Sequence, residues 1–322
     1  MKVIKITIED GADGLKIDKA LLISGVDIPR KEIRRILDKG GIQRNGKRVF
    51  VASQTVKRGD QITLSWNPAP SQKKKISVSE DDILYWKHGI LAVNKAPGLV
   101  SVPTVSAQTP FVKKLLVPFL LSKGENPDLL TACHRLDKET SGVLLFALGK
   151  DKAHWIMDQF KNKGVKKVYY AICYGIPKAK KWEVTCHLSA LDKRTGMVKV
   201  VRSGGYASST SFQLIAVSKI HGVSLLRVEP RTGRSHQIRV HLLHCLHPII
   251  GDKKYSVPRK PLHPSLAELT FEHQFLHAAS IEFSPAPGEK RVSVQAPLPE
   301  LFHSFVKKSQ MEFLVKDPAF FS

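Results

Sequence analysis

The sequence predicts an α+β protein in two parts, a small N-terminal domain of two helices and a hairpin, and a larger domain built on a mixed, largely antiparallel sheet. Two amphipathic segments and an Asn-Gly turn lie close together before residue 66. A stretch without periodicity, NPAPSQKKK, follows at residues 67–75. From about residue 79, short strand-like runs alternate with turns and a few helical segments, as is typical of an α+β domain. We therefore expect an N-terminal domain over residues 1–66, a linker over 67–78 and a main domain over 79–322.

Two helices are expected in the N-terminal domain. The segment LKIDKALLIS, residues 15–24, is amphipathic, and PRKEIRRILDKGG, residues 29–41, has a proline near its start and two glycines at its end. In the second helix Ile33, Ile36 and Leu37 share one face. The rest of its surface carries five positive charges, on Arg30, Lys31, Arg34, Arg35 and Lys39. Only Glu32 and Asp38 oppose them within this helix, so we interpret it as a phosphate-binding surface rather than an ordinary solvated face.

A hairpin follows in IQRNGKRVFV, residues 42–51, because Asn45 and Gly46 both tolerate positive φ. Arg44 and Lys47 flank this turn and extend the basic surface. Two helices with one basic face, followed by a basic hairpin, resemble the small RNA-binding module named after ribosomal protein S4. The resemblance covers residues 14–66 and implies that the basic side chains of this module contact RNA.

The charge of the chain points to a polyanionic partner. Its 322 residues include 51 Lys and Arg against 28 Asp and Glu, a formal net charge of +23. Such an excess favours nucleic acid over an anionic membrane or a merely basic surface, because phosphate binding releases condensed counterions. No apolar run is long enough to cross a bilayer, and the start, MKVIKITIEDGADG, lacks the features of a signal peptide. We expect a cytoplasmic protein that binds no membrane.

The cysteines and histidines do not predict a metal site. Four cysteines are scattered without a C-x-x-C pair and are expected to be reduced thiols. His241, His244 and His247 have a spacing that could hold a metal if a further ligand came from elsewhere. Without an H-E-x-x-H arrangement, the interpretation as ordinary helix residues is stronger.

Short runs of apolar and β-branched residues predict the strands of the main domain. They are ILAVNK, GVLLFAL, VYYAICYG, SFQLIAV, VSLLRVE, ASIEF and RVSVQAP. Because successive side chains in a strand face opposite ways, Tyr169 and Tyr170 cannot enter one pocket together.

The segment HRLDKETSGVLLFAL places Asp137 immediately before an apolar strand. A carboxylate there is unfavourable unless it is paired. It could cap the turn through Thr140 or Ser141, as short polar side chains often do. It could instead be a catalytic base or nucleophile that an arginine keeps ionised. Spacing alone favours the cap.

The same string resembles, at every fixed position, the H-R-L-D-x-x-T-S-G signature of the RluA family of pseudouridine synthases. Further family marks follow in order, in ILAVNKAPGLV, KVYYAICYG, RTGRSHQIRVHLLHCLHPIIGD and LHAASIEF. The resemblance implies that Asp137 is the catalytic aspartate and that Arg135, with its neighbour His134, helps to displace and hold the target nucleotide. It also implies that Tyr169, not Tyr170, is a catalytic residue facing the substrate, where it could shuttle the C5 proton or stack beneath the base.

Two further roles are implied for the segment RTGRSHQIR. Arg234 corresponds to the basic residue that pairs with the catalytic aspartate, and Ile238 to an aliphatic residue against the base. Ser235 is expected to be the N-cap of the following helix. Arg231 and Arg234 would then meet the positive end of a helix dipole, which is reasonable only if an anion, Asp137 or an RNA phosphate, shares the site.

The implied reaction is the isomerisation of uridine in RNA, which needs neither metal nor organic cofactor. The resemblance favours ribosomal over transfer RNA as substrate, and a monomer suffices for the chemistry. Two alternatives are a catalytically silent RNA-binding or ribosome-assembly protein and a serine hydrolase using Ser141, His134 and Asp137. The combination of Arg135, Asp137, Tyr169 and Arg234 disfavours the first. The second lacks a G-x-S-x-G elbow, and its three residues are too close in sequence for a triad.

Overall fold

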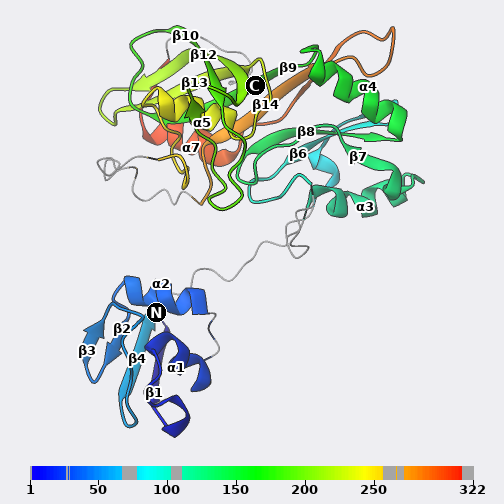
Figure 1. Ribbon diagram of the computed structural model, residues 1–322. Coiled ribbons are helices and arrows are strands. Elements are labelled where there is room, and N and C mark those ends of the chain that lie inside the picture. Colours follow the sequence, from blue (N-terminus) through cyan, green and yellow to red (C-terminus); the bar gives the residue numbers. More distant parts are fainter. Residues whose placement is uncertain are drawn as a thin grey trace. The chain divides into compact units, whose positions relative to one another are not determined.

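The computed structural model describes residues 2–26, 28, 30–66, 78–102, 111–256, 266 and 272–313 (Figure 1). The chain forms two compact units, residues 1–76 and residues 77–322. The boundary between them falls within the expected linker. Residues 67–77 lie outside the described residues, so the linker assignment stays a prediction.

The N-terminal unit is a four-stranded antiparallel sheet covered by two helices. Its strands have the order β1-β4-β2-β3, and its helices pack apolar faces that include Leu21, Ile33 and Leu37 against Ile62 and Leu64. The predicted hairpin is present, with Asn45 at φ 49° and Gly46 at φ 77°. The elements are β1 Lys2–Thr7, α1 Ile17–Ile23, α2 Arg30–Asp38, β2 Ile42–Arg44, β3 Lys47–Val49 and β4 Gln61–Trp66. Strand β1 was not predicted.

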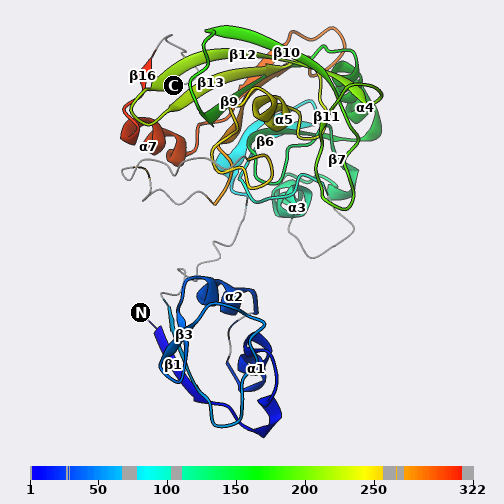
Figure 2. The same ribbon diagram turned by 60° about the vertical axis from the view of Figure 1, so that its left-hand side comes forward.

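The main unit is one twelve-stranded mixed sheet (Figure 1, Figure 2). Its main path has the order β11-β10-β12-β13-β9-β14-β8-β6-β5, with β15 on β14, β16 on β12 and β7 on β8. All its described strand pairings are antiparallel except β14 with β8, which confirms the predicted fold class. The predicted strand runs all fall on observed strands. The strands are β5 Ile83–Lys87, β6 Ile90–Lys95, β7 Leu130–Ala132, β8 Ser141–Leu148, β9 Lys166–Tyr174, β10 Lys181–Leu188, β11 Val200–Val201, β12 Tyr206–Ser218, β13 Val223–Pro230, β14 Leu276–Phe283, β15 Val292–Gln295 and β16 Glu312–Phe313.

Helices cover both faces of β6 and β8, which explains why β8 is buried along its whole length. Alternate residues of a strand face opposite sides of the sheet. Val143 and Leu145 pack with Ile156 of α4, whereas Leu144 and Phe146 pack with α3. The helices of this unit are α3 Val112–Ser122, α4 Lys150–Lys161, α5 Gln237–His244 and α7 Glu300–Lys308. In the described part of the chain, no helix is long and apolar enough to cross a bilayer.

The loop of residues 133–140, between β7 and β8, is held at its C-terminal side. Gly142 lies at φ 108°, and a Cβ there would be 2.1 Å from the Ala278 carbonyl oxygen, so only glycine permits the parallel contact of β8 with β14. The buried Lys95 ammonium at the end of β6 donates to the carbonyl oxygens of Ala96, Leu99 and Lys138 at 2.9, 3.0 and 3.1 Å. The loop therefore projects from the best-packed strand of the sheet.

Candidate active site

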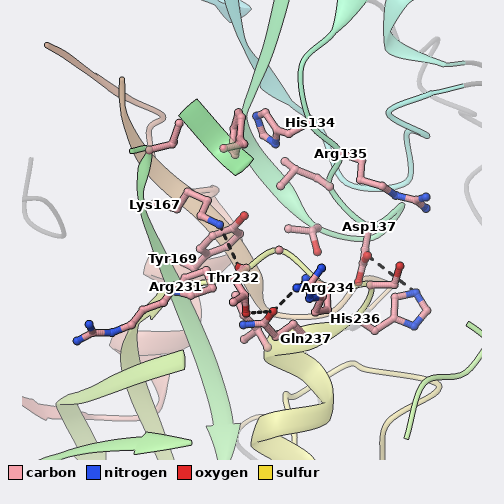
Figure 3. Close-up of a pocket in the computed structure, with 18 of the residues that line it drawn as sticks. His134, Arg135, Asp137, Lys167, Tyr169, Arg231, Thr232, Arg234, His236 and Gln237 are labelled. Carbon is pink, nitrogen blue, oxygen red and sulfur yellow. Dashed lines mark hydrogen bonds and ion pairs between the residues drawn. The ribbon is translucent and has the colours of Figure 1, made fainter. Parts of the chain in front are cut away.

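A cavity of about 510 Å³ lies beside this loop (Figure 3). It is lined by residues 133–137 and Thr140, by the end of α4 and start of β9, and by residues 230–239 between β13 and the first turn of α5. The cavity contains every catalytic and substrate-binding residue expected from the sequence: His134, Arg135, Asp137, Tyr169, Arg231, Arg234 and Ile238.

Asp137 is paired with Arg239, not with Arg234. Its Oδ2 accepts a hydrogen bond from Arg239 Nη1 at 2.9 Å. Both groups are largely shielded, with side-chain exposures of 18% for Asp137 and 8% for Arg239. The capping alternative is not seen among the described residues: the Thr140 hydroxyl bonds Gln274 and the Ser141 hydroxyl bonds His277, and neither contacts the Asp137 carboxylate. The loop thus presents an oriented carboxylate to the cavity.

The expected pairing of Arg234 with Asp137 is wrong. Arg234 is exposed, its Nε donates to the Ala207 carbonyl oxygen at 3.1 Å, and its guanidinium lies 5.5 Å from the centre of the Tyr206 ring. The physical reason is the position of the helix start. Helix α5 begins at Gln237, so the arginine in its first turn that reaches the loop is Arg239.

The N-cap of α5 is His236 and not the expected Ser235. His236 has the left-handed backbone φ of 55°. The His236 side chain makes no capping hydrogen bond to α5. Gln237 Oε1 instead accepts from the Arg234 backbone N–H, before the helix, at 3.0 Å and from the Thr232 hydroxyl at 2.7 Å. Its Nε2 donates to Ser209 O and Thr210 Oγ1, both at 2.9 Å, so the buried amide holds the 231–236 connection against β12.

His236 is a second neighbour of Asp137 that the sequence analysis did not identify. Its Nε2 is 3.9 Å from Asp137 Oδ1, and its Nδ1 is 2.8 Å from the Tyr255 hydroxyl. That hydroxyl also accepts the Val198 backbone N–H at 2.6 Å. Burial lowers the pKa of His236 below its ordinary value, although the charge of Asp137 opposes this. Burial thus favours the neutral imidazole.

Tyr169 faces the cavity, while Tyr170 is fully buried in the core, as the alternation of β9 predicts. Burial, and then the charge of Asp137, raises the pKa of Tyr169, which keeps its hydroxyl protonated. Lys167 lies two residues earlier on the same face and donates to the Thr232 carbonyl oxygen at 3.1 Å. Burial lowers the pKa of Lys167 to about 8. Ile238 adds a largely buried aliphatic surface.

His134 and Ser141 cannot form a hydrolytic triad with Asp137. His134 Nε2 accepts the backbone N–H of Leu145 at 3.0 Å, and burial lowers the pKa of this imidazole to about 3. The Ser141 hydroxyl is buried against His277 Nδ1 at 2.9 Å. The hydrolase alternative is therefore wrong. His134 instead supports the cavity wall by packing on Phe160, with ring centres 4.9 Å apart.

Two arginines lie at the exposed mouth of the cavity. Arg135 is exposed and makes no ion pair with any described residue. Arg231 has a side-chain exposure of 64% and is 3.8 Å from Glu183. Both can meet an anion that approaches from solvent.

The basic surface of the N-terminal unit is more paired than its sequence suggested. Asp18 of α1, which is fully buried, accepts from Arg30 Nε at 3.0 Å and Arg34 Nε at 2.8 Å. Arg35 pairs with Glu32, and Arg44 with Asp60. Glu32 and Asp38 are the acidic residues within α2, as expected, but Asp18 of the neighbouring helix adds an opposing charge that the pattern of α2 alone does not contain. Lys39 and Lys47 are exposed, and the Lys31 side chain lies outside the described residues.

Within the described residues, no three His, Cys, Asp or Glu side chains gather as a metal site. The absence of a metal or cofactor stays a prediction. The sequence did not predict five residues at this site: Arg239, Asp252, His236, Gln237 and Lys167. One signal was available for Arg239, a charged side chain in the helix segment IRVHLL, whose other positions are apolar apart from His241.

The comparisons agree with this geometry. The family described as RNA pseudouridylate synthase matches residues 89–244, and the S4 domain matches residues 15–62.

The chain is 30% identical over 306 residues to the ribosomal large subunit pseudouridine synthase C of Vibrio cholerae, covering 91% of this chain and 92% of that protein. It is 32% identical to an uncharacterized RNA pseudouridine synthase of Chlorobaculum parvum, covering 89% and 91%. The solved structure of human RNA Pseudouridylate Synthase Domain Containing 4 has a TM-score of 0.59 and 26% identity, covering 72% of this chain and 94% of that one. The chain therefore belongs to the RluA family of RNA pseudouridine synthases, isomerases that convert uridine in RNA to pseudouridine, and carries an S4 domain.

Proposed function

We propose that this protein isomerises one or more uridines of large-subunit ribosomal RNA, with Asp137 as its catalytic carboxylate. The observation that carries the choice of RNA is the likeness to a Vibrio cholerae relative named as a ribosomal large subunit synthase, along 92% of that protein. The S4 domain and the net charge of +23 support a large polyanionic substrate. The protein acts in the cytoplasm as a monomer, without metal or cofactor.

The reaction breaks the bond from C1′ to N1 of uridine, turns the uracil and joins C1′ to C5. In one route Asp137 attacks C1′ as the uracil leaves, and C5 then displaces the carboxylate. In the other, Asp137 removes the C2′ proton as the uracil leaves, C5 adds to C1′, and C2′ regains a proton. In both routes C5 loses a proton and N1 gains one. Both need an ionised carboxylate beside the ribose, which the contact with Arg239 supports.

The target uridine has to leave its stack to reach Asp137, at a cost of a few kcal/mol, about the amount that base flipping requires. The cavity offers the aromatic face of Tyr169 and the aliphatic side chain of Ile238 for contact with the everted base. Arg135 and Arg231 at its mouth are placed to bind phosphates next to the target. A structured loop fits this site better than a regular duplex, because its bases can be splayed apart.

Pseudouridine maps of total RNA, from cells with and without the protein, test the substrate. We expect one or a few positions in large-subunit ribosomal RNA to lose their modification in the absence of the protein, and to regain it with the wild-type protein but not with Asp137→Asn. Loss confined to transfer RNA would refute the ribosomal substrate. Full modification by Asp137→Asn would refute the role of Asp137.

A further inference from the structure

Asp252 is a buried carboxylate next to the cavity, and its contacts are unusually complete. Its Oδ2 accepts from Arg239 Nε at 2.7 Å and its Oδ1 from Arg239 Nη2 at 2.8 Å. Oδ1 also accepts the backbone N–H groups of Lys254 at 2.9 Å and Tyr255 at 3.0 Å. Its side chain has no exposed surface. The backbone of residues 252–255 therefore fixes Asp252, and Asp252 fixes one edge of the guanidinium.

The arrangement leaves Asp137 the other edge of the guanidinium. Arg239 uses Nε and Nη2 for Asp252, so that Nη1 reaches Asp137 at 2.9 Å. The guanidinium plane is further fixed by Tyr255, whose ring centre is 4.7 Å away. A planar, five-donor guanidinium can hold two carboxylates on two edges in this way, and an ammonium cannot.

We propose that Asp252 is a positioning residue for the isomerisation, which fixes Arg239 in one orientation and shares its charge, so that Asp137 is oriented without being neutralised. This inference rests on the proposed role of Asp137. One cation between two carboxylates leaves one negative charge, and an ionised carboxylate that is not fully compensated is the better nucleophile or base. Asp252 does not line the cavity, so it acts through its neighbours, and Arg239 is the one that contacts both Asp252 and Asp137.

The protonation states support this arrangement. Burial tends to raise the pKa of Asp252, but hydrogen bonds from Arg239 and the backbone hold it below its ordinary value. Burial tends to lower the pKa of Arg239, but both carboxylates hold it above its ordinary value. All the partners of Asp252 therefore favour its charged form. A buried ion pair seldom adds stability relative to apolar residues of similar volume, so the site explains this cluster better than the fold does.

The test is the kinetics of Asp252→Asn on an RNA fragment that contains the target uridine. We expect kcat to fall about 100-fold, the order of loss that a misplaced catalytic group produces, with KM within about threefold. The matched control is Asp192→Asn. Asp192 also accepts two backbone N–H groups, from Arg194 at 2.7 Å and Thr195 at 2.9 Å, but no guanidinium of the described residues bonds it, so kcat should not change. A kcat of Asp252→Asn equal to wild type overturns the proposal.

A double-mutant cycle with Arg239→Lys separates positioning from general stability. If Asp252 acts through Arg239, adding Asp252→Asn to Arg239→Lys lowers kcat by less than about threefold, because the shared contact is already lost. The same 100-fold loss in both backgrounds overturns the proposal. Each variant is assayed below its measured unfolding midpoint, so that loss of fold does not enter. Asp137→Asn is assayed in parallel: an inactive Asp137→Asn beside a fully active Asp252→Asn refutes this inference alone, whereas an active Asp137→Asn refutes the proposed catalytic carboxylate.

Discussion

The two units contain ion clusters of opposite composition. In the N-terminal unit one buried carboxylate, Asp18, holds two arginines, Arg30 and Arg34, whose side chains are 49% and 56% exposed. In the main unit one buried arginine, Arg239, holds two carboxylates, Asp137 and Asp252. The first cluster leaves one positive charge at the surface, and the second leaves one negative charge beside a cavity.

The sign of the uncompensated charge suits the group that each cluster is proposed to contact, a phosphate for the first cluster and the reacting nucleotide for the second. Exposed guanidinium groups held in a fixed orientation are suited to phosphate, because less side-chain freedom is lost on binding. A largely shielded carboxylate is suited to attack or proton removal, because burial limits the water that competes for it. We therefore expect the Asp18 cluster to suit phosphate binding and the Arg239 cluster to suit chemistry, because the partner in excess and its depth differ between them.

The largest effect is expected from Arg239→Met, which leaves two buried carboxylates without a cation. We expect kcat to fall by at least about 1,000-fold, because the orientation and environment of Asp137 are both lost. The free energy of unfolding should fall by about 3–5 kcal/mol, as when one partner of a buried ion pair is removed. Single-turnover pseudouridine formation and urea unfolding measure the two effects.

Arg234→Met is the informative comparison for that variant. Its guanidinium is exposed and bonded to a backbone carbonyl, so we expect a change mainly in KM, of at most about tenfold, from loss of one phosphate contact. A larger loss of kcat in Arg234→Met than in Arg239→Met would favour Arg234 as the partner of Asp137, as expected from the sequence. It would also contradict the assignment of Arg239 to the catalytic cluster.

A smaller effect is expected from the double change Arg30→Gln and Arg34→Gln in the N-terminal unit. RNA affinity should weaken, and the slope of log K against log salt should become shallower by about 1.5, since each lost phosphate contact contributes about 0.7 to 0.9. Arg58→Gln is the control, because Arg58 pairs one-to-one with Asp10 and leaves no excess charge. Filter binding over a range of salt concentrations measures both. Equal slopes for the wild type and the double variant would exclude this surface from RNA contact.

The contrast between the clusters also marks what the sequence could predict. The hairpin at Asn45 and Gly46, the buried strand β8 and the position of Asp137 follow from local rules: turn residues, apolar runs and a distinctive string. The ion-pair partners of the charged side chains do not follow from such local rules. Asp137 and Arg239 are 102 residues apart, and Asp18 and Arg34 are 16 apart on different helices, so no single-element pattern joins them.

The failed N-cap has a different cause. A serine before a helical segment usually caps it, but here His236 is the N-cap, it makes no side-chain cap hydrogen bond, and the helix begins at Gln237. The amide of Gln237 bonds backward to the Arg234 N–H and the Thr232 hydroxyl, so a side chain inside the helix holds the residues before it. A rule that begins the helix after the nearest serine does not include this contact.

The smallest effect is expected from pH acting on the Asp18 cluster. Burial tends to raise the pKa of Asp18, but its bonds to Arg30 and Arg34 hold it below its ordinary value. When the pKa of a carboxylate is lower in the folded state, its charge stabilises the fold at pH values above its unfolded-state pKa, which is about 4. This stabilisation is lost as the pH falls through the folded-state pKa. The stability difference between wild type and Asp18→Asn, measured by thermal unfolding of residues 1–76, should therefore be constant from pH 7 to 5 and shrink below about pH 4. A difference that persists unchanged at pH 2 would mean that Asp18 acts through shape alone, and the surface arginines would then owe their orientation to packing rather than to charge.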